Sequence, residues 1–345
     1  MTGTNKRKRY FPAFLCFIAG MWVCVMSLPS GNAEESETIA VPAKTEQTSP
    51  SPNTADDPNA LPPSSPAEEN ASADPNQATT DINGGSMMPN EGDVAELYRY
   101  FGLLFNETLV SKEGMVDYGA LRRKRSDLLN AVRVLENLHP AVLMSMGREE
   151  RIAFWINTYN TCSLKLIIDN YPIQPKWYMI LYPNNSIMQI TGAWDKVFFK
   201  IMGLEYNLKE MRNTLLLDRY KDPRICFALT DAACGGAMLR SEPILPSKLD
   251  EQLDDQVKRY LASPVGFRQD IPNNTVFLSN IFAMNKTVFL ASEYAEILKF
   301  RSRKPDERAW LNFLSKYLPA KEAAWLDSSD PAIRFMNFDW LLNEK

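Results

Sequence analysis

The sequence contains only one histidine, His139, among its 345 residues. Histidine is the usual general base near neutral pH and the commonest metal ligand, so its scarcity disfavours a transition-metal site and restricts base catalysis. His139 follows a predicted helix and precedes Pro140, and a histidine at a helix C-terminus commonly interacts with the helix dipole. We therefore predict no metal site and no cofactor, and His139 is kept only as a candidate base.

Cysteine is also scarce, and the absence of any Cys-x-x-Cys pair disfavours thiol redox chemistry. Of the five cysteines, Cys162, Cys226 and Cys234 lie outside the N-terminal apolar stretch. Cys226 and Cys234 would close a small disulfide loop in an oxidising compartment. Alternatively, Cys162 and Cys226 are buried as small hydrophobic residues. Both alternatives stay open on the sequence alone.

Cys234 is followed by two glycines and is the cysteine most expected to be exposed. The backbone N–H groups around Gly235 and Gly236 would then converge on a bound anion or oxyanion. A thiol in such a place is reactive when its pKa is lowered. Cys234 is therefore a candidate nucleophile, and Cys226 is a second one.

A large basic surface is missing as well. The net charge is −4: residues 1–33 contain four basic residues, and residues 34–92 contain one lysine and eleven acidic residues, so residues 93–345 are close to neutral. Basic runs occur at Lys6–Arg9 and at Arg122–Arg125, and we interpret the second as the solvated face of a helix. This charge distribution predicts no nucleic-acid partner.

The N-terminus has the pattern of an export signal. Lys6–Arg9 is followed by the apolar stretch of residues 10–28 and by small residues up to Ala33, which predicts a signal peptide of residues 1–33. The apolar stretch is nearly as long as a membrane-spanning helix, so an uncleaved anchor of residues 10–28 is the alternative. We expect an exported protein of the periplasm, cell envelope or extracellular space, which contacts the membrane only if this anchor stays uncleaved.

Residues 34–92 are rich in Pro, Ser, Ala, Asn, Thr and acidic residues, with nine prolines between Pro42 and Pro89. Such a segment cannot bury enough apolar surface to offset its conformational entropy. We predict a disordered tether.

The remainder, residues 93–345, is predicted to be a single helix-rich α+β domain with a small β-sheet. Apolar residues at helical spacing begin with Val94, Leu97 and Phe101. Helices are expected at 93–105, 118–138, 149–171, 208–217, 247–261, 306–317 and 320–326, and strands at 186–190, 225–230, 275–279 and 333–338.

Five motifs of this domain resemble, in order, those of the family called domain of unknown function 547. They are Val116–Tyr118, Ala153–Asn160, Asp222–Leu229, Leu239–Arg240 followed by a helix, and Phe338–Asn343. The resemblance implies the family's fold over most of residues 115–343. The family's activity is unsettled.

The resemblance also implies that chemical groups have been lost. Members usually have a histidine at the position of Cys226, a cysteine at Asp231, and a Cys-Pro pair at Gly236–Ala237. A histidine and thiols close together suit nucleophilic catalysis or metal binding. The chain is therefore interpreted as a degenerate member with an intact scaffold, in which Asp231 is a further candidate base.

Three polar residues are candidates for ligand binding. Asn157 and Asn160 lie in an apolar helical stretch, where buried amides either bond the neighbouring backbone or line a pocket. Arg240 matches a family arginine and would hold a carboxylate, on a ligand or on Asp231, or form a structural ion pair.

Two functions follow from these residues. The first is a non-catalytic envelope or periplasmic domain that binds an unknown small ligand or an envelope protein. The alternative is a thiol-dependent hydrolase or transferase whose nucleophile has moved to Cys234 or Cys226, with His139 or Asp231 as the base.

Overall fold

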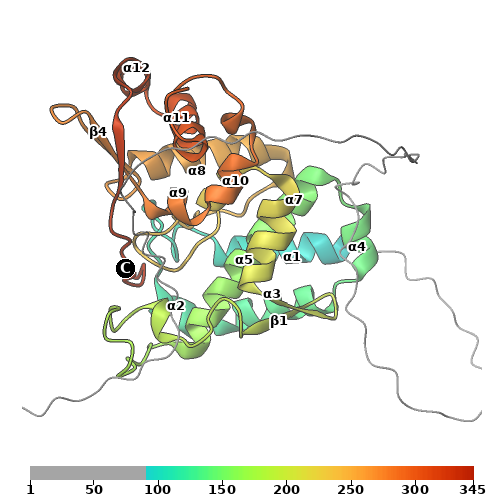
Figure 1. Ribbon diagram of the computed structural model, residues 1–345. Coiled ribbons are helices and arrows are strands. Elements are labelled where there is room, and N and C mark those ends of the chain that lie inside the picture. The colour runs from blue at the N-terminus through green and yellow to red at the C-terminus, as the bar shows by residue number, and fades with distance from the viewer. Residues whose placement is uncertain (1–90) are drawn as a thin grey trace, which may run out of the picture. The chain divides into compact units, whose positions relative to one another are not determined.

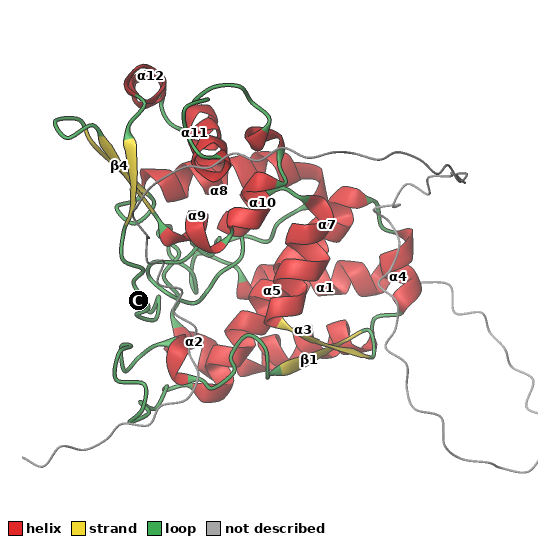
Figure 2. Cartoon of the chain, viewed as in Figure 1, coloured by secondary structure: helices red, strands yellow, loops and turns green. Residues whose placement is uncertain are grey.

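The computed structural model describes residues 91–345, which fall within one compact unit. The predicted signal peptide or anchor and the predicted tether up to residue 90 lie outside the described residues. Figure 2 shows that helices predominate and that the strands form two small sheets, as expected for a helix-rich α+β domain. No helix in this part of the chain is long and apolar enough to cross a membrane.

Helix α5 (Arg148–Asn170) lies at the centre of Figure 1 and confirms the helix predicted at 149–171. Every residue from 151 to 164 is buried, which is typical of a helix covered on all sides. Its first turn is stabilised because the Gly147 N–H donates to Glu150 Oε2 at 2.6 Å. The polar residues of α5 must therefore find partners inside the protein.

The predicted helix at 118–138 is wrong in one respect, because it is broken at Lys124. Helix α2 (Tyr118–Arg123) ends there and α3 (Arg125–Asn137) begins. The break falls within the run Arg122–Arg125, whose side chains are all exposed. Arg122 and Arg125 would be like-charged neighbours at i,i+3 on one continuous helix. Helices α1 (Glu91–Leu104) and α3 pack against each other and against α5.

Two of the four predicted strands are confirmed. Strands β3 (Phe267–Asp270) and β4 (Thr275–Leu278) are antiparallel, and β5 (Ala332–Phe335) is parallel to β4. A second sheet was not predicted: β1 (Phe198–Ile201) and β2 (Leu204–Asn207) form a hairpin. Its two turn residues, Met202 and Gly203, both have positive φ, as a tight hairpin turn requires.

The strands predicted at 186–190 and 225–230 are wrong, because both segments contain short 3₁₀ turns, η1 (Ile187–Gln189) and η3 (Pro223–Phe227). Polar caps start both turns: Ser186 Oγ accepts from Met188 N at 3.2 Å, and Asp222 Oδ1 accepts from Arg224 N at 3.0 Å. Residues 225–230 are all buried, and so are residues 186–190 except for the half-buried Met188. A buried run does not by itself distinguish a strand from other buried backbone.

The remaining predicted helices are confirmed with small shifts in their ends. The chain also forms short helices that were not predicted, among them α4, α9 and α10. The bounds are α4 (Pro140–Ser145), α6 (Leu208–Arg212), a π-helical stretch η2 (Asn213–Leu217), α7 (Asp218–Tyr220), η4 (Pro246–Lys248), α8 (Leu249–Ala262), α9 (Asn280–Met284), α10 (Lys286–Leu290), η5 (Glu293–Ala295), α11 (Pro305–Tyr317) and α12 (Ala320–Ser329).

The last residues of the chain, 339–345, pack against three distant segments. Val116 N donates to Asn343 O at 2.7 Å, and Cys234 N donates to Leu341 O at 2.7 Å. Leu342 N donates to Asn185 O at 2.9 Å. The C-terminal segment therefore holds the start of the domain and the segment around Cys234 together.

Candidate functional site

The segment from Asp222 to Arg240 carries the positions where chemical groups were expected, and it is largely buried. Cys226 lies in η3 and is fully buried. Burial raises the pKa of its thiol to about 12, since a thiolate is poorly solvated there. Cys226 therefore stays protonated at neutral pH, and it matches the alternative of a small buried hydrophobic residue.

Asp231 forms a buried ion pair that the sequence did not indicate. Arg212 Nη1 donates to Asp231 Oδ1 at 2.6 Å, and both residues are less than a tenth exposed. Arg212 Nη2 also donates to Asn285 Oδ1 at 3.2 Å. The expected partner Arg240 is engaged elsewhere, so the pairing of Arg240 with Asp231 is wrong. Asp231 is thus held as the counter-charge of a buried guanidinium.

The second carboxylate oxygen of Asp231 has no hydrogen-bond partner and is shielded from solvent. Gly236 faces it, because a β-carbon on this glycine would lie 3.4 Å from Asp231 Oδ2. Tyr159 completes the buried cluster. Burial, and secondly the charge of Asp231, raises the pKa of the Tyr159 hydroxyl to about 12. The position of the expected family thiol is therefore occupied by a closed polar cluster.

Cys234 is only partly exposed, and its surroundings do not activate it. Its Sγ donates to Leu342 O at 3.5 Å. Burial, followed by the charge of Asp339, raises the pKa of the thiol. The three cysteines of the described part are free, so the disulfide between Cys226 and Cys234 is not formed.

The predicted oxyanion site beside Cys234 is also wrong. Gly235 N donates to Asp339 O at 2.8 Å, and Gly236 N donates to Ala233 O at 3.0 Å. The N–H groups that were expected to face a ligand are therefore already used. Gly235 is required for a different reason, since a β-carbon there would lie 2.5 Å from Asp339 N.

His139 does not end the preceding helix, as predicted, but starts the next one. Helix α3 ends at Asn137, and His139 Nδ1 accepts from Ala141 N at 3.2 Å at the start of α4. The side chain is exposed, and its hydrogen bond is with backbone of α4 and not with a cysteine. An imidazole that caps a helix through Nδ1 is positioned by the backbone, not by a thiol.

The family model described as "Protein of unknown function, DUF547" matches residues 143–261. This part of the chain belongs to the DUF547 family. No curated protein and no solved structure matches the chain. The match contains α5 and the segment from Asp222 to Arg240, whereas Val116–Tyr118 and Phe338–Asn343 lie outside it.

Two amides of the DUF547 segment form paired bonds with buried backbone. Asn157 Nδ2 donates to Ile244 O at 2.8 Å, and its Oδ1 accepts from Ile244 N at 2.9 Å. Asn160 Nδ2 donates to Ala228 O at 2.9 Å, and its Oδ1 accepts from Thr230 N at 3.0 Å. These are the contacts expected of the structural alternative. The ligand-binding role of both residues stays a prediction.

Arg240 forms a structural ion-pair cluster with acidic residues. Its Nη2 donates to Glu242 Oε1 at 2.6 Å, and its Nη1 donates to Asp255 Oδ2 at 2.5 Å on α8. Glu242, in turn, has a lowered pKa, chiefly because of the hydrogen bond from Arg240. A ligand carboxylate would have to compete with both acids, and this role of Arg240 also stays a prediction.

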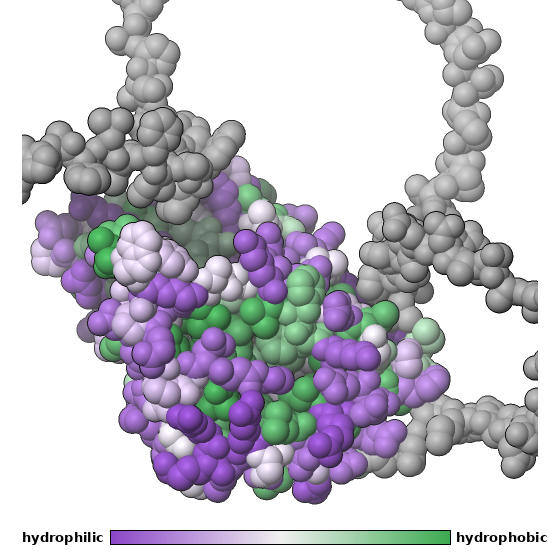
Figure 3. Space-filling model, turned by 90° about the horizontal axis from the view of Figure 1, so that it is seen from below, coloured by the Kyte–Doolittle hydropathy of each residue, from purple (hydrophilic) through white to green (hydrophobic). Residues whose placement is uncertain are grey.

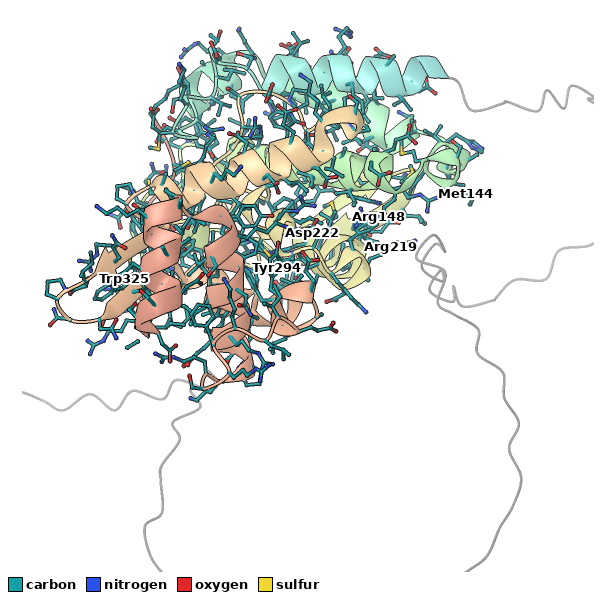
Figure 4. All side chains as sticks on the ribbon, turned by 90° about the horizontal axis from the view of Figure 1, so that it is seen from above. Met144, Arg148, Arg219, Asp222, Tyr294 and Trp325 are labelled. Atoms are coloured by element: carbon teal, nitrogen blue, oxygen red, sulfur yellow. The ribbon has the colours of Figure 1, made fainter. Side chains whose placement is uncertain are left out.

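A polar cavity of about 370 Å³ opens where the segment from Asp222 to Arg240 begins. Arg148 approaches it from the start of α5, Asp222 from the cap of η3 and Tyr294 from η5, as the view from above shows (Figure 4). Arg224 donates to Asp222 at 2.7 Å and to Asp254 at 2.8 Å. The wall includes Arg148, Tyr220, Lys221, Asp222, Arg224, Glu293, Tyr294 and Lys316.

This cavity was not predicted, although Asp222 and Arg224 belong to the motif Asp222–Leu229. Lys316 Nζ donates to the Tyr294 hydroxyl at 3.0 Å, so residues of η5 and α11 contribute to its wall. The elements η5 and α11 both follow residue 261, where the family match ends, and no local sequence spacing links them to Asp222. The cavity contains none of the predicted nucleophiles or bases, and its paired charges suit recognition of a polar ligand.

Proposed function

We propose that the domain is a non-catalytic binding domain of an exported protein of the cell envelope or periplasm. Its partner is a polar small ligand, held in the cavity beside Asp222 and Arg224, or an envelope protein. One observation carries the proposal: the groups at the family's expected chemical positions are buried or bonded within the protein. Cys226 is inaccessible, and Asp231 neutralises Arg212.

The alternative, a relocated thiol nucleophile, needs an exposed thiol with a lowered pKa and a base within reach. The pKa of Cys226 and that of Cys234 are both raised, and His139 accepts a backbone N–H in α4. No contact of the described residues favours this alternative over the binding domain.

Thiol titration tests the absence of an activated cysteine. A chromogenic disulfide reagent is added to the native full chain and to Cys234→Ser, and the difference in rate isolates Cys234. We expect Cys234 to react more slowly than free cysteine at pH 7. Its rate should keep rising with pH beyond the ordinary thiol range, because its raised pKa keeps the thiolate fraction low at neutral pH.

The matched control is Cys226→Ser, which should change the number of reactive thiols only after unfolding in urea, because Cys226 is fully buried. A phase that is lost in Cys234→Ser and that exceeds the rate of free cysteine at pH 7 would reveal an activated thiolate. That result would restore the hydrolase or transferase alternative.

Export is tested with a reporter that is active only outside the cytoplasm. Residues 1–92 are fused to alkaline phosphatase in a bacterial host, and we expect phosphatase activity because residues 6–33 have the pattern of an export signal. The control fusion lacks residues 10–28 and should be inactive. Soluble product would indicate cleavage after Ala33, and membrane-bound product would indicate the anchor. An inactive parent fusion would disprove export.

A further inference from the structure

The loop after α5 exposes three large apolar side chains within five residues. Trp177 is 87% exposed, Ile180 is 81% exposed and Leu181 is 90% exposed. We call residues 176–183 the apolar loop. A soluble protein rarely leaves such a concentration of apolar surface in water unless the surface has a partner.

The apolar loop is held in this exposed form by one buried side chain. Gln189, which is 2% exposed, accepts from Lys176 N at 2.8 Å. Its Nε2 donates to Met179 O at 3.2 Å and to Pro183 O at 3.1 Å. Because both ends of the loop are fixed from beneath, Trp177, Ile180 and Leu181 project outward from a defined support.

The composition of the loop favours a lipid surface as the partner. Residues 171–194 contain no aspartate or glutamate, and their one charged residue is Lys176. Tryptophan and tyrosine are preferred where a bilayer meets water, because their rings are apolar and carry one polar group. Trp177 and Tyr178 are adjacent at this position, and Ile180 and Leu181 supply the purely apolar tip.

A basic run lies at the same side of the molecule. The side chains of Arg122–Arg125 are exposed. Arg125 is 50% exposed and its Nη2 donates to Asp169 Oδ1 at 2.7 Å, next to the end of α5 where the loop segment starts. In Figure 1, α2, α3, β1 and the loops after α5 all lie at the lower edge. Seen from below, apolar residues gather in the middle of that face with hydrophilic residues around them (Figure 3).

We propose that the apolar loop inserts into the interfacial region of a lipid bilayer, with Arg122–Arg125 facing anionic headgroups. Insertion would remove the apolar tip from water without burying any acidic group, and the arginines would gain electrostatic attraction. This surface is separate from the polar cavity, so the inference does not depend on the proposed ligand or on the absence of catalysis.

Fluorescence quenching of the full chain tests the proposal. The chain is bound to vesicles of phosphatidylcholine and phosphatidylglycerol, with and without bromine atoms on the phosphatidylcholine acyl chains. Subtracting the emission of Trp177→Phe from that of the unchanged chain isolates Trp177 among the seven tryptophans. We expect most of the Trp177 emission to be lost in brominated vesicles, because bromine quenches only rings that reach the acyl chains.

The matched control subtracts the emission of Trp325→Phe in the same way, which isolates Trp325. This residue lies on α12 at the opposite, upper edge of Figure 1, so its emission should not be quenched. Ile180→Ser combined with Leu181→Ser should restore the Trp177 emission, because the tip would no longer insert. Unquenched Trp177 on vesicle-bound protein would overturn the proposal and leave the loop as a surface for a protein partner. Failure of the chain to bind vesicles would overturn it as well.

Discussion

Replacing Asp231 by alanine is expected to lower the free energy of unfolding of the domain by about 3–5 kcal/mol. The variant leaves the guanidinium of Arg212 buried without its carboxylate partner, while its bond to Asn285 remains. Desolvation of a charge is costly when no opposite charge compensates it. Urea denaturation followed by circular dichroism measures the change.

Two controls separate this effect from a general loss of contacts. Arg212→Met combined with Asp231→Leu removes both charges, and it should recover most of the lost stability because apolar residues of similar volume can replace a buried pair. Asp327→Ala removes an exposed pair with Lys299, and it should cost at most about 1 kcal/mol. If Asp231→Ala costs no more than Asp327→Ala, the cluster is not the closed ion pair described above.

Replacing Phe227 by alanine is expected to lower the free energy of unfolding by about 3–5 kcal/mol, through lost burial and the cavity left behind. Phe227 is fully buried next to Cys226. Its ring centroid lies 5.4 Å from Tyr260, 5.5 Å from Phe282 and 5.6 Å from Phe313. The substitution thus opens the contact between the DUF547 segment and the helices that follow it.

The control for Phe227 is Phe198→Ala in β1, because the Phe198 side chain is 52% exposed and should contribute little. Thermal unfolding by calorimetry, together with urea denaturation, compares the two variants. Equal losses for Phe227 and Phe198 would contradict the packing described here. Neither ring lines the polar cavity, so a loss of ligand binding in either variant would come from unfolding and not from a lost contact with the ligand.

Long helices were predictable because apolar spacing and capping residues are local signals. Helix α5 and helix α11 were found within one or two residues of their observed ends. The segment 225–230 was not, because burial on all sides removes the alternation that distinguishes strands. The hairpin of β1 and β2 was missed since its turn, Met202-Gly203, lacks the usual Asn-Gly or Asp-Gly pair.

The candidate site was less predictable, because its side chains choose partners that are distant in the chain. The sequence offered Arg240 as a partner for Asp231, whereas Arg212 holds that position. The two cysteines were close enough in sequence for a disulfide, yet Cys226 is fully buried in η3, whereas Cys234 Sγ donates to Leu342 O of the C-terminal segment. Spacing identified the important segment, and tertiary contacts determined its chemistry.

The C-terminal segment has a consequence for how the chain acquires its structure. The hydroxyl of Tyr118 donates to Asn343 Oδ1 at 2.7 Å across 225 positions of sequence. During synthesis, the strand-like residues beside Tyr118 therefore leave the ribosome long before the residues that cover them. Such distant closure is slow. The contacts of Val116, Tyr118 and Cys234 with residues 339–343 therefore form only after those residues have left the ribosome, so this side of the domain closes last.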